Sequence, residues 1–139
     1  MIRIMLDTYT LIAGMVFGGN ERKLLHDIYL NKAILIVNEY VVLETKAILK
    51  QRFPGFEKLF DDLLQLLQVE ATPMPSQESV EEAREIIRDP KDAIALAAAM
   101  AAKPDLFVSG DLDFHTSDVK LLINVMHVKE AIALVNYQR

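Results

Sequence analysis

Short apolar runs alternate with longer amphipathic segments along the whole chain. Residues 2–6, 33–37 and 106–108 are apolar almost throughout, which is typical of strands that are buried on both faces of a parallel sheet. Residues 68–71 and 121–125 are shorter or less uniform, and we interpret them as two further strands. The pattern therefore predicts a sheet of about five strands.

Helices are expected between these strands. Apolar residues recur at helical spacing in residues 21–30, 56–67, 77–87, 90–102 and 129–136, and a helical segment is also expected between the first strand and the Gly18-Gly19 break. Asn38 is a suitable N-cap for a helix whose apolar stripe runs from Val41 to Leu49, and Ser76 and Asp89 are suitable N-caps further along.

The alternation of strands and helices predicts an α/β fold with a mainly parallel sheet. No internal repeat and no convincing linker interrupts the chain, so we expect a single domain over residues 1–139. In parallel sheets of this class, ligands bind beyond the carboxyl ends of the strands. The residues that follow each strand are therefore the first place to look for chemistry.

Composition excludes several classes of protein. The chain has no cysteine, which rules out disulfides, thiol catalysis and cysteine zinc sites. Its longest apolar run, residues 93–102, is shorter than the roughly 18 residues of a membrane span, and the N-terminal apolar stretch is too short for a signal peptide. We expect a cytoplasmic protein without membrane contact. The net charge of −5 is unusual for a nucleic-acid binder.

Carboxylates follow the predicted strands. Asp7 directly follows the first strand, and Asp111 and Asp113 follow the fourth. Glu44 lies on the helix after the second strand, and Asp92 lies in the first turn of the helix before the fourth. If these groups converge, their mutual repulsion favours a hard divalent cation such as Mg²⁺ or Mn²⁺. Such a site could activate a water and stabilise the leaving oxygen of a phosphodiester.

Each acid also has a structural interpretation. Asp92 suits a helix N-terminus, Glu44 could lie on a solvated helix face, and Asp111 and Asp113 could be turn residues. Whether Asp111 approaches Asp92 depends on the strand order, which spacing does not define. Without the five carboxylates, 15 acidic residues remain against 15 basic ones. The chain then has cations to meet phosphates, namely Arg22, Lys23, Lys46 and Lys91.

Other motifs are weak. The chain has no phosphate-binding loop and no dinucleotide fingerprint, and the Asp7-Thr8-Tyr9 stretch lacks the second aspartate of a haloacid-dehalogenase loop. The three histidines share no ligand spacing. His115 lies near the Gly110-Asp111 turn and is kept as a candidate for substrate contact.

Taken together, three segments resemble the PIN-domain family, in particular PIN-type (VapC-like) toxins of prokaryotic toxin–antitoxin systems. They are IRIMLDTYTLIAGMVFGG (residues 2–19), VNEYVVLETKAIL (37–49) and DPKDAIALAAAMAAKPDLFVSGDLDF (89–114). The last, with its acidic start, alanine-rich helix, strand and Ser-Gly-Asp, is the most specific. The resemblance covers essentially the whole chain.

The resemblance implies a three-layer α/β/α sandwich and a metal-dependent ribonuclease with Mg²⁺ or Mn²⁺ as cofactor. Asp7, Glu44, Asp92 and Asp111 match the family's acidic residues, and Asp113 matches a further acid of many members. These five are the candidate metal ligands, and the first four are the candidate catalytic residues. Four neighbours are candidates for contact with substrate or ligands: Thr8, Tyr9, Lys91 and Ser109.

The resemblance also implies partners. A toxin has an RNA substrate and a cognate antitoxin, which is expected to insert a basic or amphipathic segment near the acidic groove. Homodimers are common in the family, and the helix at 56–67, including Phe60, is a candidate interface. The alternatives are a PIN-like binding module with a weakened metal site, because Tyr9 replaces the asparagine of many members, and a structural domain with scattered acids.

Overall fold

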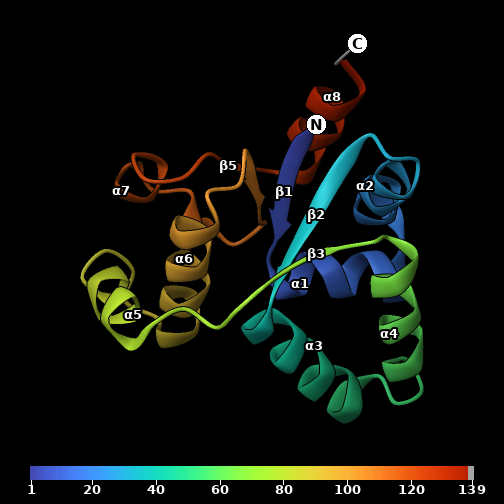
Figure 1. The fold of residues 1–139 in the computed structure, drawn as a ribbon, viewed down its shortest axis with the longest axis horizontal. Coiled ribbons are helices and arrows are strands. Elements are labelled where there is room, and N and C mark those ends of the chain that lie inside the picture. The colour runs from blue at the N-terminus through green and yellow to red at the C-terminus, as the bar shows by residue number, and fades with distance from the viewer. Residues whose placement is uncertain (138–139) are drawn as a thin grey trace.

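A computed structural model describes residues 1–137 of the chain and has a five-stranded sheet at its centre (Figure 1). All four strand pairs are parallel, and the strand order is β3-β2-β1-β4-β5. The strands are β1 (Ile2–Leu6), β2 (Ala33–Asn38), β3 (Glu70–Thr72), β4 (Leu106–Val108) and β5 (Val125–Met126). The predicted α/β fold with a parallel, five-stranded sheet is confirmed.

Helices connect the strands and cover both faces of the sheet. Their bounds are α1 (Thr8–Ile12), α2 (Gly19–Tyr29), α3 (Glu39–Arg52), α4 (Glu57–Leu66), α5 (Gln77–Arg84), α6 (Pro90–Ala102), α7 (Ser117–Lys120) and α8 (Val128–Tyr137). A π-helical segment, Ala13–Phe17, extends α1, and a 3₁₀ turn, Leu112–Phe114, follows β4. Asn38, Ser76 and Asp89 cap α3, α5 and α6 as predicted.

The period of two along each strand divides the core into two layers. Ile4 and Leu35 lie in the layer between the sheet and α1, α2, α3, α4 and α8, whereas Met5, Ile36 and Phe107 face the layer under α5 and α6. Figure 1 shows the same division, with α5, α6 and α7 on one side of the strands and α1, α2 and α4 on the opposite side. The three-layer arrangement follows from apolar residues on both sheet faces.

The predicted fifth strand over residues 121–125 is wrong in its position. Residues 117–120 form α7, capped by Thr116, and the strand is only Val125–Met126. Leu121 is 84% exposed, so its apolar side chain does not belong to a buried strand. The apolar run misled the prediction because a short capped helix precedes the strand and exposes two leucines.

Smaller differences concern element ends. Helix α5 ends at Arg84 rather than at residue 87, and β3 begins at Glu70 rather than at residue 68. Gln68 adopts a φ of 52° in the turn after α4, which is incompatible with a strand. Gly14 allows close packing of the π-helical segment on α2, since a Cβ there would lie 2.6 Å from Leu25.

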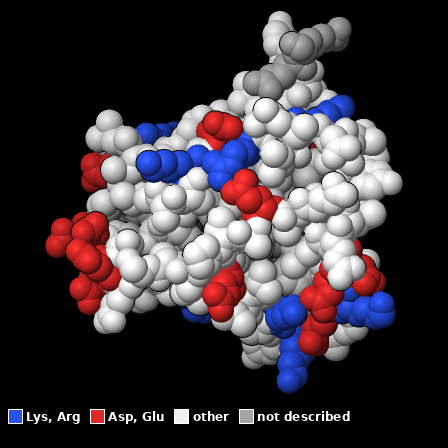
Figure 2. Space-filling view, in the orientation of Figure 1, with Lys and Arg blue, Asp and Glu red and all other residues white. Residues whose placement is uncertain are grey.

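Charged side chains are unevenly distributed on the surface. On the face in Figure 2, acidic side chains gather over α5, which contains Glu78, Glu81 and Glu82. Acidic and basic side chains are mixed over α3 and α4, where Lys46 and Asp61 form an ion pair of 3.1 Å. Among residues 1–137, no helix has the length and apolar character needed to cross a bilayer.

Candidate functional site

Asp7 lies at the carboxyl end of the central strand β1, where it also begins α1. Its Oδ1 accepts a hydrogen bond of 2.8 Å from the backbone N–H of Thr10, so the carboxylate acts as the N-cap of α1. The residue is 9% exposed. Burial raises the pKa of Asp7, hydrogen bonds from Ser109 and Thr10 oppose the increase, and Asp111 adds to it. A positively charged group beside Asp7 would stabilise the ionised form of this buried carboxylate.

Ser109 connects the ends of β1 and β4. Its hydroxyl donates to Oδ2 of Asp7 and accepts a hydrogen bond of 3.0 Å from the backbone N–H of Asp111. The ring nitrogen Nε2 of His115 donates to the carbonyl oxygen of Ser109 at 2.7 Å, and the His115 ring stacks on His127 with centroids 3.9 Å apart. Ser109 thus orients two of the candidate acids, and His115 supports its backbone rather than lining the cavity.

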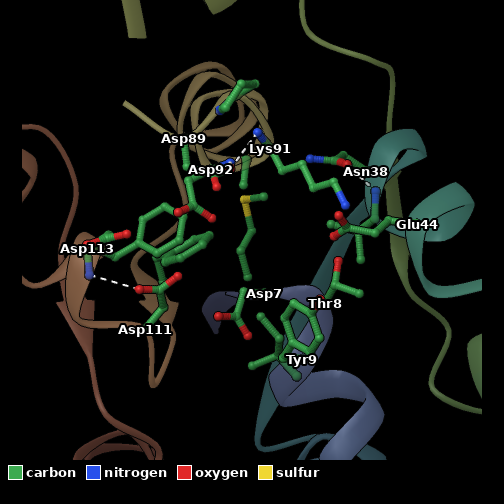
Figure 3. A pocket seen from close by; sticks show the side chains of 17 residues that line it. Asp7, Thr8, Tyr9, Asn38, Glu44, Asp89, Lys91, Asp92, Asp111 and Asp113 are labelled. Carbon is green, nitrogen blue, oxygen red and sulfur yellow. Dashed lines mark hydrogen bonds between the residues drawn. The ribbon is translucent and has the colours of Figure 1, made fainter. Parts of the chain in front are cut away.

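Three carboxylates gather at the end of β4 and the start of α6. Asp92, Asp111 and Asp113 each offer one oxygen, and these oxygens all lie within 4.8 Å of one another. Asp92 is held in the first turn of α6 by the Asp89 cap, which accepts from the N–H groups of Lys91 and Asp92. Asp111 Oδ1 accepts from the Asp113 N–H at 2.9 Å. Figure 3 shows the cluster opposite Glu44.

The electrostatics of this cluster are unfavourable without a cation. Desolvation by burial, followed by the charges of Asp111, Asp89, Asp113 and Asp7, raises the pKa of Asp92 from 3.8 to about 7. The effect reflects several negative groups around one carboxylate, each disfavouring ionisation of the next. A bound cation would reverse it by favouring the charged form.

A cavity of about 450 Å³ joins these groups to the other predicted residues. Its lining includes all five candidate metal ligands, and Thr8, Tyr9 and Lys91 as well: Asp7, Thr8, Tyr9, Glu44, Lys91, Asp92, Asp111 and Asp113 (Figure 3). Asp7 and Glu44 line the cavity outside the group of three whose oxygens lie closest together. Tyr9 lines the cavity and is 60% exposed, so its ring lies toward the solvent side of the lining.

Glu44 is on the opposite wall, on α3. Its Oε2 accepts a hydrogen bond of 2.8 Å from the hydroxyl of Tyr40, one helical turn earlier. Burial, and then the hydrogen bond and charge of Glu44, raise the pKa of Tyr40, so the phenol stays protonated and keeps donating. Glu44 is therefore oriented by a partner that sequence reasoning missed.

Two of the cations suggested for phosphate contact have other partners. Arg22 donates to the carbonyl oxygens of Gly14 and Met15, at 2.9 and 3.0 Å, and closes the end of the π-helical segment. Lys46 pairs with Asp61 on α4. Lys91 lines the cavity, whereas Arg22 caps backbone carbonyl groups and Lys46 forms a surface ion pair.

Sequence reasoning treated Asn38 and Asp89 only as helix caps, but both line the cavity. Asn38 ends β2 and begins α3 at the carboxyl edge of the sheet, whereas Asp89 lies in the loop between α5 and α6. The rule that ligands bind at this edge would have included Asn38, but it does not extend to Asp89.

The donor set fits a hard divalent cation. The three clustered side chains are all carboxylates, and oxygen ligands of this kind suit Mg²⁺ or Mn²⁺ rather than zinc or copper. The raised pKa of Asp92 agrees with this, because burial and then the charges of the neighbouring carboxylates disfavour its ionised form, and a cation would favour it. The residues present therefore fit the metal that the sequence analysis expected.

Comparison with known proteins agrees with the architecture. The chain is similar to FitAcB from Neisseria gonorrhoeae, with a TM-score of 0.66 and 16% identity over 91% of this chain and 98% of that chain. It is also similar to FitAB bound to an IR36 DNA fragment, with a TM-score of 0.65 and 14% identity over 90% of this chain and 94% of that chain. The TM-scores show a shared fold, and at such low sequence identity the similarity shows nothing beyond the fold.

No match is found among curated proteins. A profile of the PIN domain, however, matches residues 3–113, which is most of the chain and includes all five candidate acids. The protein therefore belongs to the PIN-domain family.

Proposed function

We propose that the protein is a ribonuclease that depends on Mg²⁺ or Mn²⁺ and acts as the toxin of a toxin–antitoxin pair. The observation that carries the proposal is the convergence of carboxylates from separate elements on one cavity, with three of them within 4.8 Å and the pKa of Asp92 raised to about 7. Groups under such repulsion, in a cleft at the carboxyl edge of a parallel sheet, are typical of a functional site.

Asp92, Asp111 and Asp113 would hold the cation, and Asp7 would complete the negative wall from the end of β1. When bound, the cation supplies positive charge that promotes ionisation of water and stabilises a leaving oxygen. Ser109 keeps the Asp7 carboxylate in place by its hydrogen bond. Glu44, which Tyr40 orients on the opposite wall of the cavity, would accept a proton from a water molecule.

The surface charge supports a role for the cation in substrate binding. On the face in Figure 2, Lys and Arg side chains are interspersed with acidic ones and form no continuous basic surface. A chain with a net charge of −5 repels a polyanion at long range. Divalent cations and Lys91 at the cavity would offset this repulsion, so RNA affinity should depend strongly on the metal.

The experiment is cleavage of a structured RNA by the purified protein with Mn²⁺, alongside Asp111→Asn, Asp7→Asn and a chelator. We expect cleavage by the wild type and loss of at least a hundredfold in each variant, since groups that stabilise the transition state are worth factors of this order. Cleavage that persists in both variants would come from a contaminant.

The alternative function is a PIN-like binding module with a weakened site, which the presence of Tyr9 motivates. Tyr9 lines the cavity, but all five candidate acids line it too, which favours the nuclease. Calorimetry separates the two. If the protein is a nuclease, it should bind Mn²⁺, and Asp92→Asn should weaken this binding strongly. If it is a silent module, it should bind no Mn²⁺, or bind it with an affinity that Asp92→Asn does not change.

As a toxin, the protein would act on RNA in the cytoplasm and be inhibited by a cognate antitoxin. A basic or amphipathic antitoxin segment near the acidic cavity would compete with the metal or with RNA. Co-expression with the protein encoded by a neighbouring gene, followed by the cleavage assay, tests this: inhibition is expected, and full cleavage in a stable complex would argue against it.

A further inference from the structure

In the side-chain amide of Asn38, the oxygen accepts a hydrogen bond and the nitrogen donates none among residues 1–137. Asn38 ends β2 and caps α3, and its Oδ1 accepts a hydrogen bond of 2.8 Å from the backbone N–H of Val41. Since only the oxygen of an amide can accept from an N–H, this bond determines the orientation of the group. Nδ2 is therefore the other end, and among residues 1–137 it has no hydrogen-bond partner.

The free amide is also buried. Asn38 is 0% exposed, and a buried donor without a partner destabilises a fold, because the donor loses its hydrogen bonds to water and gains none in exchange. Capping does not explain this arrangement, because serine or aspartate caps a helix equally well. Ser76 and Asp89 perform that task for α5 and α6 in the same chain. The amide nitrogen therefore needs an explanation beyond the helix start.

Nδ2 is directed toward a part of the cavity wall that carries other hydrogen-bond donors, whereas the remaining charged residues of the lining are carboxylates. Asn38 shares a sheet face with Ile36, under α6, and lines the same cavity as the acidic cluster. Figure 3 shows its side chain directed from the start of α3 toward the N-terminus of α6, on the wall opposite Asp111 and Asp113. Lys91 and Thr8 line the cavity too, so this side offers an ammonium group and a hydroxyl.

The chemistry of the ligand follows from what the amide can offer. An asparagine that reads adenine uses its oxygen and its nitrogen together. Here the amide oxygen of Asn38 is occupied by the helix cap, so only the N–H donors of this amide are left for a ligand. Donors alone fit an acceptor-only group, and beside the Lys91 ammonium the fitting group is a phosphate oxygen.

We propose that Asn38 binds RNA through its Nδ2, which donates a hydrogen bond to a non-bridging phosphate oxygen of the strand that lies across the cavity. This inference rests on the proposed ribonuclease function. Asn38 contacts the sugar–phosphate backbone of the RNA and makes no contact with the bases. It thereby positions the RNA strand with respect to the carboxylates on the opposite wall. Its cap to α3 keeps the amide in place when no substrate is bound.

The test compares Asn38→Ser with the wild type. Serine keeps an oxygen to cap α3 and removes the amide donors, so the melting temperature should stay the same or rise. The dissociation constant for a short labelled RNA, measured by anisotropy with Ca²⁺ in place of Mn²⁺, should increase about tenfold, as for loss of a hydrogen bond to a charged group. Mn²⁺ affinity by calorimetry should not change.

Two further variants sharpen the result. Asn38→Asp also caps α3 but places a carboxylate near the phosphate, so it should weaken RNA binding more than Asn38→Ser. Asn124→Ser is the matched control, because the Asn124 amide donates to the carbonyl oxygen of Asp105 outside the cavity. It should leave RNA affinity at the wild-type value.

The phosphate itself is tested with RNAs that carry a single methylphosphonate at successive positions. At one position the modification should weaken binding by the wild type and have no added effect in Asn38→Ser. Equal penalties in both proteins at every position, or an unchanged dissociation constant for Asn38→Ser, would overturn the inference while leaving the ribonuclease proposal intact. Absence of RNA binding and cleavage by the wild type would overturn both.

Discussion

The hydroxyl of Ser109 donates a hydrogen bond to the carboxylate of Asp7 across 102 positions of sequence. The bond exists because β4 pairs with β1 in parallel register, so that both strands end at the same edge of the sheet. It joins the residue after one strand to the residue after its neighbour. The acidic wall of the cavity is built on this connection.

Replacing Ser109 by alanine should therefore disturb two acids together. Asp7 loses a donor and the Asp111 N–H loses an acceptor, both at a fully buried position. We expect the free energy of unfolding to fall by about 1–3 kcal/mol and Mn²⁺ affinity to fall with it. Denaturant unfolding and calorimetry measure both. Ser79→Ala, which removes an exposed hydroxyl contact, should change neither.

Asp92→Asn should stabilise the metal-free protein while weakening metal binding. At pH 8 the substitution removes a charge that its neighbours repel. Because Asp92 is partly exposed and solvent screens the repulsion, we expect a gain of only about 1–2 kcal/mol in the free energy of unfolding. The melting temperature with and without Mn²⁺ checks both effects. Glu81→Gln on α5 is the control, and destabilisation by Asp92→Asn without metal would contradict this interpretation.

The stability of the metal-free protein should depend on pH through Asp92. Its pKa of about 7 in the folded state exceeds the ordinary 3.8, so the folded state binds the proton more tightly. The contribution to stability is complete below about pH 4, declines as the pH rises toward 7 and is absent above. Unfolding of the wild type and Asp92→Asn between pH 4 and 8 should show the difference in that window. A pH-independent difference would argue against it.

Mn²⁺ binding should have the opposite pH dependence. The metal needs deprotonated carboxylates, so affinity should rise as the pH approaches 7 and binding should release protons below it. Calorimetry at pH 6 in two buffers of different ionisation enthalpy counts the protons released. Asp92→Asn should release fewer, and equal release by both proteins would point to another group.

Tyr40→Phe should affect catalysis more than stability. The variant keeps the ring and removes the 2.8 Å hydrogen bond that orients Glu44. We expect RNA cleavage to slow about tenfold, with a change in the free energy of unfolding below about 1 kcal/mol. Tyr29→Phe, on the exposed surface of α2, is the matched control. Wild-type cleavage by Tyr40→Phe would show that Glu44 needs no such support.

A homodimer through α4 remains a prediction, but Phe60 is the wrong probe for it. Phe60 is 0% exposed and packs inside the chain, so Phe60→Glu would unfold the protein. Leu59 and Leu66 are 47% and 58% exposed. Leu59→Glu combined with Leu66→Glu should halve the mass measured by light scattering if α4 is the interface, and an unchanged mass would exclude it.

Local elements were predictable because their causes are local. The apolar run of β1, the Asn38 and Ser76 caps and the Asp89-Pro90 start of α6 each depend on a few neighbouring residues. The fifth strand was misplaced where two signals competed, since the apolar character of Leu121 and Leu122 resembled a strand but the Thr116 cap produced α7.

The sequence by itself determined most of the elements, their order along the chain, and the acids that follow β1 and β4. Only the tertiary structure decided that β1 lies between β2 and β4, which brings Asp7 to Ser109 and places Glu44 across the cavity from Asp111. Strand order depends on how the two sheet faces are covered, a balance of burial over the whole chain that no short segment contains. The free amide of Asn38 emerged for the same reason, because its burial beside the cavity depends on the packing of elements that are distant in sequence.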